Sequence, residues 1–241
     1  MPDTIFAEPR LAEIYDAVDH DRSDLAVYLA ITEELGASSI LDIGCGTGTF
    51  ACLLALRGKD VTGVDPAAAS LEVARRKPGA QHVRWLRGDA AALPPLQVDL
   101  VTMTGNVAQV FLTDDDWTAT LRAARSALRP RGSLVFETRD PAREAWRTWT
   151  RHHSVQRLEV PGVGSVEAWV DVADVSPPLV SFRSTFVFAT DGIVLTSAST
   201  LRFRSRDEVS DSLRAAGFDV HEVRDAPDRP GLELVFIATA A

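Results

Sequence analysis

The first half of the chain alternates between short apolar runs and longer segments with helical periodicity. The short runs predict buried strands at 40–43, 61–65, 83–86, 98–102 and 133–138. Between them, apolar residues recur three and four positions apart. That spacing predicts helices over 9–18, 23–35, 49–56, 66–77 and 113–128. Strands that alternate with helices predict an α/β fold built on a parallel sheet.

Residues 140–204 follow a different pattern, in which apolar and polar residues alternate. This alternation predicts strands at 155–160, 163–175, 180–188 and 194–203, with Asp191-Gly192 as a hairpin turn. Helix and strand patterns of the core type return from residue 205. We therefore expect a core of residues 1–139 and 205–241 and an inserted antiparallel β meander at 140–204. The insertion could cover the active site as a lid or join two subunits of a homodimer.

Composition narrows the class of protein. The 241 residues are 46% hydrophobic, enough for a sizeable core, and the net charge is −9 with a pI of about 5.0. No basic stripe is present, which argues against nucleic acid and favours a small-molecule substrate. The two cysteines, Cys45 and Cys52, suit a reducing cytoplasm. We find no leader pattern and no apolar stretch of membrane-spanning length, so we expect a cytoplasmic protein without a membrane partner.

Three glycines at alternate positions, Gly44, Gly46 and Gly48, connect the strand at 40–43 to the helix at 49–56. A glycine turn before a helix lets a ligand approach the backbone, and the helix N-terminus favours a negative group. The spacing differs from the dinucleotide fingerprint G-x-G-x-x-G, because Thr49 stands beyond the last glycine. Asp65 and Asp89 end the next two predicted strands, so they should lie on the same rim of the sheet.

At these residues the chain resembles the class I S-adenosylmethionine-dependent methyltransferases. The stretches that carry the resemblance are 41–48, Val64-Asp65, Gly88-Asp89-Ala90, 98–101 and 128–134. Together they cover roughly residues 11–139 and 205–241. The resemblance implies a Rossmann-like seven-stranded sheet with S-adenosyl-L-methionine across the carboxyl ends of its first three strands. The antiparallel insertion is similar to that of small-molecule N-methyltransferases of the amino-sugar or glycine type.

The resemblance also implies roles for individual residues. The glycines would flank the methionine part of the cofactor, Asp65 would hold the ribose, and Asp89 with Ala90 would bracket the adenine. Asp42 would orient the loop and the cofactor's amino end. The full set of expected cofactor residues is Tyr15, Asp42, Gly44, Cys45, Gly46, Gly48, Asp65, Pro66, Asp89, Ala90, Met103 and Thr104. For Tyr15, closing over the cofactor's carboxylate and anchoring a short helix are both open interpretations.

Candidate residues for the acceptor follow the fourth and fifth predicted strands. Asn106 and Gln109 offer hydrogen bonds, although Gly105-Asn106 is also a common turn pair. Arg139 lies at the rim, where it could contact the substrate or form an ion pair with the insertion. Trp146 could form an aromatic wall or pack in the core together with Trp149, since both would share one helix face.

The chemistry expected of such a site is transfer of the methyl group to a nitrogen or oxygen atom by in-line displacement. A neutral amine needs no base at the moment of attack, whereas a hydroxyl usually does. The candidate bases are His152, His153 and Glu137. The two histidines stand at the entry to the insertion, and since adjacent residues on a strand point to opposite faces, at most one would face the site. That both are surface or interface residues is the other interpretation. We see no cluster of residues with metal-ligand spacing and expect no metal.

Two alternatives remain open from the sequence. A non-catalytic protein that binds S-adenosylmethionine would carry the same motifs, because the motifs report binding and not turnover. A pocket filled by Met103, Phe111 or the tryptophans would favour that reading. A nicotinamide-dependent oxidoreductase is disfavoured by Thr49 and by Asp89 at the adenine position.

Overall fold

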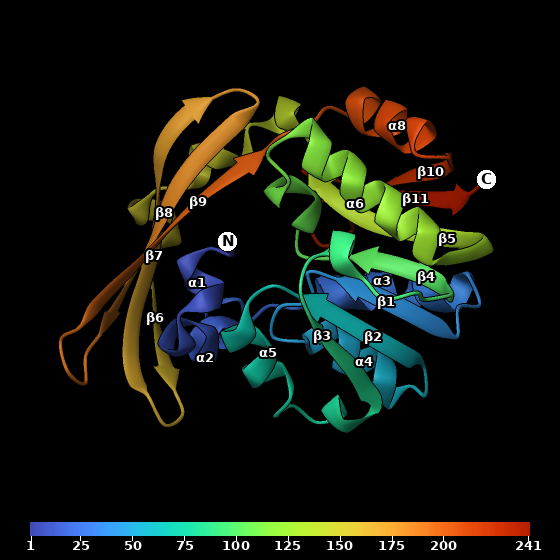
Figure 1. Ribbon diagram of the computed structural model, residues 1–241. Coiled ribbons are helices and arrows are strands. Elements are labelled where there is room, and N and C mark those ends of the chain that lie inside the picture. The colour runs from blue at the N-terminus through green and yellow to red at the C-terminus, as the bar shows by residue number, and fades with distance from the viewer.

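A computed structural model describes residues 1–241 and contains two sheets (Figure 1). The larger sheet has seven strands in the order β10-β11-β5-β4-β1-β2-β3. The bounds of its strands are β1 Ser39–Ile43, β2 Asp60–Asp65, β3 Val83–Arg87, β4 Val98–Met103, β5 Leu128–Arg139, β10 Phe218–Asp225 and β11 Glu233–Ala240. The expected α/β class and seven-stranded sheet are confirmed.

Strand direction places the chemistry at one edge of this sheet. β1 lies between β2 and β4 and is parallel to both. The next pairs outward, β2 with β3 and β4 with β5, are parallel as well. β11 runs antiparallel to both β5 and β10. The carboxyl ends of the five parallel strands therefore meet at the same rim, where ligands bind in open α/β sheets.

Helices cover both faces of the seven-stranded sheet. On one face, Leu25, Phe50 and Leu54 of two helices pack against Ile40 of β1. On the other face, Trp117 and Leu213 pack around Phe136 and Phe236, whose rings are stacked. The α-helices are α1 Thr4–Ala7, α2 Pro9–Val18, α3 Asp24–Glu34, α4 Thr49–Leu56, α5 Ala68–Ala74, α6 Asp114–Ala127, α7 Arg151–Ser154 and α8 Arg206–Ala215. The short 3₁₀ helices are η1 Ala80–His82, η2 Ala90–Ala92, η3 Val107–Val110, η4 Pro141–Arg143 and η5 Ala145–Thr148.

The second sheet is an antiparallel meander in the order β6-β7-β8-β9. Its strands are β6 Gln156–Val160, β7 Gly164–Ser176, β8 Leu179–Phe188 and β9 Val194–Arg202. Phe186 and Phe188 of β8 pack against Leu11 and Ile14 of α2. In Figure 1 this sheet stands beside the core, with α1 and α2 between the two sheets. The N-terminal helices therefore join the meander to the rest of the molecule.

Three local features differ from the expected pattern. The strand expected at 133–138 begins earlier, at Leu128, and contains Arg131 with a φ of 65° beside a register shift against β4. α1 was not expected, because four residues are too few to show a period. His152 and His153 lie on the short helix α7 and not on a strand.

No helix is long and apolar enough to span a membrane.

Candidate functional site

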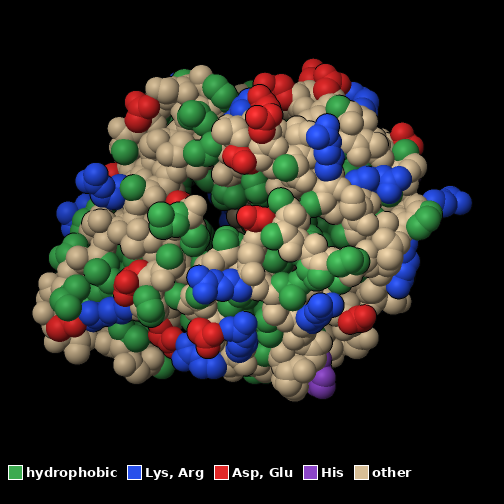
Figure 2. Space-filling model, in the orientation of Figure 1, with side chains coloured by type: hydrophobic (Ala, Val, Ile, Leu, Met, Phe, Trp, Pro, Cys, Tyr) green, Lys and Arg blue, Asp and Glu red, His purple; other side chains and the backbone are tan.

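A cavity of about 840 Å³ lies between the carboxyl rim of the large sheet and the strands β8 and β9. Figure 2 shows the molecule hollowed at its centre. Eight of the twelve residues expected to bind the cofactor line the cavity, namely Tyr15, Gly44, Cys45, Gly46, Asp65, Pro66, Asp89 and Thr104. The chain thus brings the ends of β1, β2, β3 and β4 to one space, as the parallel topology requires.

The glycine turn between β1 and α4 adopts a backbone that only glycine takes readily. Gly44, Gly46 and Gly48 have φ values of 69°, 54° and 76°. The Gly44 N–H donates to the carbonyl of Val64 at 2.9 Å, which fixes the turn to β2. A Cβ at Gly46 would meet no protein atom within 4 Å. The space beside Gly46 is therefore open to a ligand that lies against the backbone.

Asp65 ends β2 beside this turn. Its two carboxylate oxygens accept the backbone N–H groups of Gly46, at 2.9 Å, and Ala67, at 2.8 Å. Burial raises the pKa of Asp65, while these two hydrogen bonds oppose the shift. The carboxylate keeps lone pairs toward the cavity, so it can accept two hydroxyl groups of a ligand.

Four of the expected cofactor residues do not line the cavity. Asp42, Gly48, Ala90 and Met103 are all buried beneath the rim. The side chain of Asp42 accepts the Thr102 hydroxyl at 2.8 Å, and burial raises its pKa to about 7. Its role in orienting the loop and the cofactor remains a prediction.

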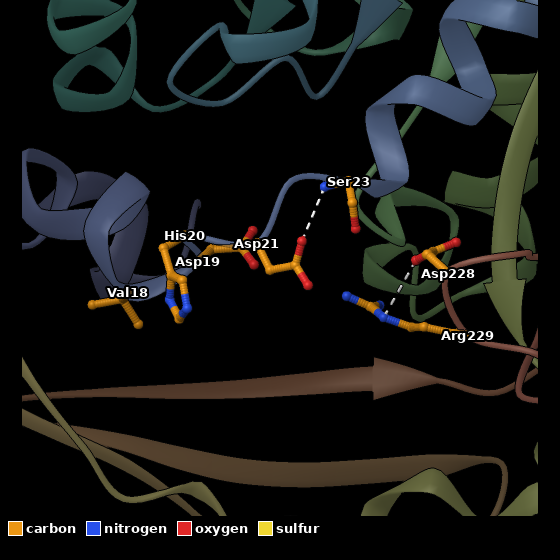
Figure 3. A pocket seen from close by; sticks show the side chains of 7 residues that line it. All are labelled: Val18, Asp19, His20, Asp21, Ser23, Asp228 and Arg229. Atoms are coloured by element: carbon orange, nitrogen blue, oxygen red, sulfur yellow. Dashed lines mark hydrogen bonds and ion pairs between the residues drawn. The ribbon is translucent and has the colours of Figure 1, made fainter.

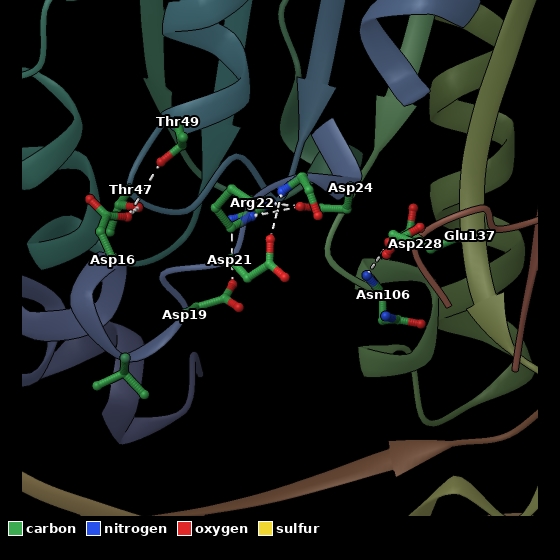
Figure 4. Close-up of polar contacts among 12 residues, drawn as sticks. Asp16, Asp19, Asp21, Arg22, Asp24, Thr47, Thr49, Asn106, Glu137 and Asp228 are labelled. Carbon is green, nitrogen blue, oxygen red and sulfur yellow. Dashed lines mark hydrogen bonds and ion pairs between the residues drawn. The ribbon is translucent and has the colours of Figure 1, made fainter. Parts of the chain in front are cut away.

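Sequence reasoning missed Arg22, which lines the cavity at the loop between α2 and α3. Its guanidinium donates to Asp24 at 3.1 and 3.2 Å and forms an ion pair with Asp19 at 3.5 Å (Figure 4). An arginine held by acids in this way is a fixed cation that can face a carboxylate. Neighbouring Tyr15 has its pKa raised to about 12 by burial and by the nearby Asp19. No motif in the sequence marks Arg22, because its position depends on how the loop packs.

The same loop borders a second, smaller hollow of about 240 Å³. The side chains around it are mostly charged or polar (Figure 3): Val18, Asp19, His20, Asp21, Ser23, Asp228 and Arg229. None of the residues expected to bind the cofactor or the acceptor lines this hollow.

A polar latch ties α2 to the glycine turn. We use this name for Asp16, Thr47, Thr49 and Lys77, of which Figure 4 shows the first three. Lys77 Nζ lies 2.5 Å from Asp16 Oδ2 and 2.6 Å from Thr49 Oγ1, and the Thr47 hydroxyl donates to Asp16 at 2.6 Å. Since Thr47 and Thr49 line the cavity, the latch holds the N-terminal helices over the turn.

Replacing Lys77 with methionine should loosen this latch. The variant keeps the apolar stem but loses the ion pair, so we expect about fivefold weaker binding of S-adenosylhomocysteine in calorimetry, from about 1 kcal/mol of lost positioning. Lys59→Met is the matched control, because Lys59 is the only other lysine and pairs with Glu33 on the surface. Equal affinities for the two variants would show that the latch does not shape the site.

The residues expected to meet the acceptor lie outside the cavity lining. A polar network joins three of them, because Asn106 donates to Glu233, Arg139 forms an ion pair with Glu233, and Arg139 also donates to Gln109. Their side chains are directed toward the sheet and away from the cavity. Trp146 is buried against Phe203 at 4.6 Å between ring centroids, which agrees with a packing role.

Of the candidate bases, neither histidine reaches the cavity. His152 and His153 are exposed on α7, and the Thr150 hydroxyl lies 2.9 Å from His153 Nδ1. The local chain forms a helical turn on the surface and not a strand, so neither histidine is directed at the cavity. Glu137 lies at the rim but is buried beneath Asn106.

The chain is similar to known proteins over the segment that contains the glycine turn, Asp65 and Asp89. Residues 40–132 match the family described as methyltransferase domain. The cypemycin N-terminal methyltransferase of a Streptomyces species is 30% identical over 146 residues, which cover 59% of this chain and 60% of that protein. The malonyl-acyl-carrier-protein O-methyltransferase of Serratia marcescens is 34% identical over 136 residues, which cover 54% and 49%. The chain thus spans only about half to three-fifths of the length of these relatives.

Over residues 40–132 this chain is therefore similar to a methyltransferase domain. Solved structures agree over nearly its full length. DesVI from Streptomyces venezuelae superposes with a TM-score of 0.77 at 19% identity and covers 95% of this chain and 98% of its own. CalS10, a SAM-bound amino pentose methyltransferase from Micromonospora echinaspora, gives 0.75 at 22% identity and covers 95% and 97%. At these identities the similarity shows that the methyltransferase fold includes the second sheet.

The cofactor of class I methyltransferase domains is S-adenosylmethionine, and the residues present fit it. The open space at Gly46 suits a ligand pressed against the backbone, and Asp65 has free lone pairs for a ribose. Arg22 is the cation that could face the methionine carboxylate. Asp89 caps η2 through the Ala92 N–H and lies exposed at the cavity, where an adenine amine could donate to it.

Proposed function

We propose that this chain transfers a methyl group from S-adenosyl-L-methionine to a nitrogen or oxygen atom of a small molecule. The observation that carries the proposal is the extent of the cavity. It runs from the glycine turn to β8 and β9, and its volume of about 840 Å³ lies in the upper part of the range of roughly 300–1,000 Å³ that is usual for ligand pockets. Neither Met103, Phe111 nor any tryptophan lines it, so space remains beside the cofactor for an acceptor.

The wall opposite the cofactor residues supports a small organic acceptor. Phe6 and Phe182 supply apolar surface, and Val110 and Leu112 are exposed at the same cavity. Hydroxyl groups stand between them on the second sheet: Ser181, Ser199 and Thr200. Apolar surface with a few polar groups is typical of a pocket that orients a small molecule.

The chain's own contribution to the reaction would be positioning. When bound, S-adenosylmethionine supplies a methyl group already activated by its sulfonium. Thr104, Gly105 and Val107 form the wall that borders the space for both reactants. A fixed wall holds a nucleophile near the line of attack and excludes water. None of the three candidate bases lines the cavity, which favours an amine that attacks in its neutral form.

We infer that residues 140–204 act as a unit that closes the acceptor side. Strands β8 and β9 contribute side chains to the cavity, which supports the lid interpretation. A homodimer through the outer face of this sheet remains the second possibility. A small-molecule substrate and a cytoplasmic location belong to the same proposal, supported by the net charge of −9 and by two free cysteines.

Calorimetric titration tests the proposal directly. The purified protein is titrated in turn with S-adenosylmethionine, S-adenosylhomocysteine and NAD. We expect the first two to bind and NAD not to bind. Binding of NAD alone would overturn the assignment of the glycine turn. Binding without methyl transfer to any amine or hydroxyl compound in a broad screen would favour the non-catalytic alternative.

Replacing Asp65 with alanine should remove most cofactor affinity without unfolding the protein. Two charge-assisted hydrogen bonds to a ribose support a loss of about a hundredfold or more. Asp60→Ala is the matched control, because Asp60 stands exposed at the other end of β2. Circular dichroism would report the fold and calorimetry the affinity. Unchanged affinity in the Asp65 variant would contradict the cofactor pose.

A further inference from the structure

The segment Thr104–Val110 is the first part of the connection between β4 and α6, and it forms the wall shared by the cofactor and acceptor sides. Thr104, Gly105, Val107 and Val110 line the cavity. Gly105 and Asn106 both have positive φ, 78° and 61°, and Asn106 is the residue before η3. Asparagine tolerates this left-handed region better than other non-glycine residues do, so the contacts that Asn106 makes decide where the turn lies.

Asn106 is held from two sides by glutamates of the sheet. Its backbone N–H donates to Oε1 of Glu137 on β5, as Figure 4 shows. Its side-chain Nδ2 donates to Oε1 of Glu233 on β11 at 3.1 Å. These glutamates come from neighbouring antiparallel strands, in which Val235 is paired with Glu137. Asn106 therefore bridges two strands that are far apart in the sequence.

Two arginines complete this network and extend it to the end of the segment. Arg229 Nη1 donates to Glu233 at 2.7 Å, and Arg139 Nε lies 3.5 Å from the same carboxylate. Arg139 Nη1 also donates to the side-chain oxygen of Gln109 at 2.9 Å. Asn106 and Gln109, at the two ends of a helical turn, are thus fixed to the same pair of strands.

The network is poorly suited to stabilise a core. Asn106 Oδ1 and Gln109 Nε2 are buried and have no hydrogen-bond partner. Glu137 is 2% exposed and has no cation within ion-pair distance, whereas Glu233 has two. Apolar side chains of similar size would pack there without leaving buried polar groups unpaired. The polar groups therefore call for an explanation other than packing.

Val107 connects this network to the cofactor side, because its side chain packs against the glycine turn. A Cβ at Gly44 would lie 2.6 Å from Val107 Cγ2, so the valine side chain rests directly on the glycine turn. Val107 directly follows the residue whose N–H is held by Glu137. A shift of Asn106 would move Val107 against or away from the turn.

We propose that Glu137 is a positioning residue, which sets the Thr104–Val110 segment and through Val107 the glycine turn. This inference rests on the proposed function, since it assigns a role within that site. Glu137 touches neither reactant and acts through the Asn106 N–H and the packing of Val107. It differs from the sequence-based expectation that Glu137 is a base, because its carboxyl group does not line the cavity.

The test compares two variants of Glu137 with a buried control. Glu137→Leu removes the acceptor for the Asn106 N–H, whereas Glu137→Gln keeps an oxygen there. Thr138→Val is the control, because Thr138 is equally buried on β5 with its side chain on the opposite face. The readouts are calorimetric affinity for S-adenosylhomocysteine and hydrogen exchange of the peptide that contains residues 104–110, neither of which needs a known acceptor.

We expect Glu137→Leu to bind S-adenosylhomocysteine about tenfold more weakly and to exchange faster within 104–110, while the Gln and Thr138→Val variants stay within about twofold of the parent. Wild-type affinity in Glu137→Leu, or faster exchange spread over the whole chain, would overturn the proposal. If Glu137→Leu does not fold, Glu137→Asp keeps the carboxylate but draws it back from the Asn106 N–H and should give the same pattern. If the parent protein itself does not bind, the proposed function fails, and the exchange data alone decide the positioning role.

Discussion

Replacing Gly44 with alanine is expected to destabilise the protein by about 2–4 kcal/mol and to abolish binding of S-adenosylhomocysteine. Two costs add at this position. The φ of 69° is strained for any residue with a Cβ, and the new Cβ would lie 2.6 and 2.8 Å from the two Cγ atoms of Val107. Relief of the overlap would push Val107 and the shared wall away from the turn, so the site would lose its geometry together with stability.

Gly58→Ala separates the two costs. Gly58 has a similar φ of 77°, but its Cβ would meet nothing within 4 Å and it lies away from the cavity. That variant should lose only the backbone term, about 1 kcal/mol, and should bind normally. Urea unfolding of both variants measures the difference. The double variant Gly44→Ala/Val107→Ala should recover part of the steric term. Equal stability of the Gly44 and Gly58 variants would contradict close packing between Val107 and the turn.

The fold was largely predictable because its signals are local. The strand at 40–43, the glycine turn and the helix at 49–56 fall where the apolar runs and glycines place them. The antiparallel insertion was equally visible, since alternation and the Asp191-Gly192 turn fix its hairpins. Both signals depend on residues within a few positions of one another.

The site was only partly predictable because its remaining parts depend on distant contacts. Arg22 reaches the cavity through ion pairs in a loop, and no spacing marks it. Asn106 and Gln109 are polar residues after a strand end, which suggested substrate contacts. The structure turns them instead toward Glu233 and Arg139, which come from strands later in the chain. A sequence pattern does not show which side of a loop faces the sheet.

Asp42→Asn is expected to make the protein more stable, not less, at neutral and higher pH. Burial raises the pKa of Asp42 from 3.8 to about 7, against the opposing hydrogen bond from Thr102. The folded protein therefore binds a proton more tightly than the unfolded chain between these two pH values. Stability falls as the pH rises through this window, by about 4 kcal/mol in total for a shift of this size.

The asparagine does not titrate, and its oxygen can still accept the Thr102 hydroxyl. Urea unfolding of both proteins should give similar stabilities near pH 4, a growing advantage for the variant between pH 4 and 7, and a constant advantage of about 2–4 kcal/mol above pH 7. A variant whose stability relative to the parent does not grow between pH 4 and pH 7 would contradict the raised pKa of Asp42. Thr102→Val is the comparison, since it removes the hydroxyl and leaves the carboxyl group.

The same substitution should weaken binding of S-adenosylhomocysteine by about tenfold or more, because a carboxylate beside the turn attracts the ligand's amino group more than an amide does. Higher stability together with weaker binding would indicate that Asp42 serves binding at the expense of stability. A buried acid that only filled space would give the gain in stability with no change in affinity. The two measurements on one variant therefore decide whether Asp42 belongs to the cofactor site from beneath the rim.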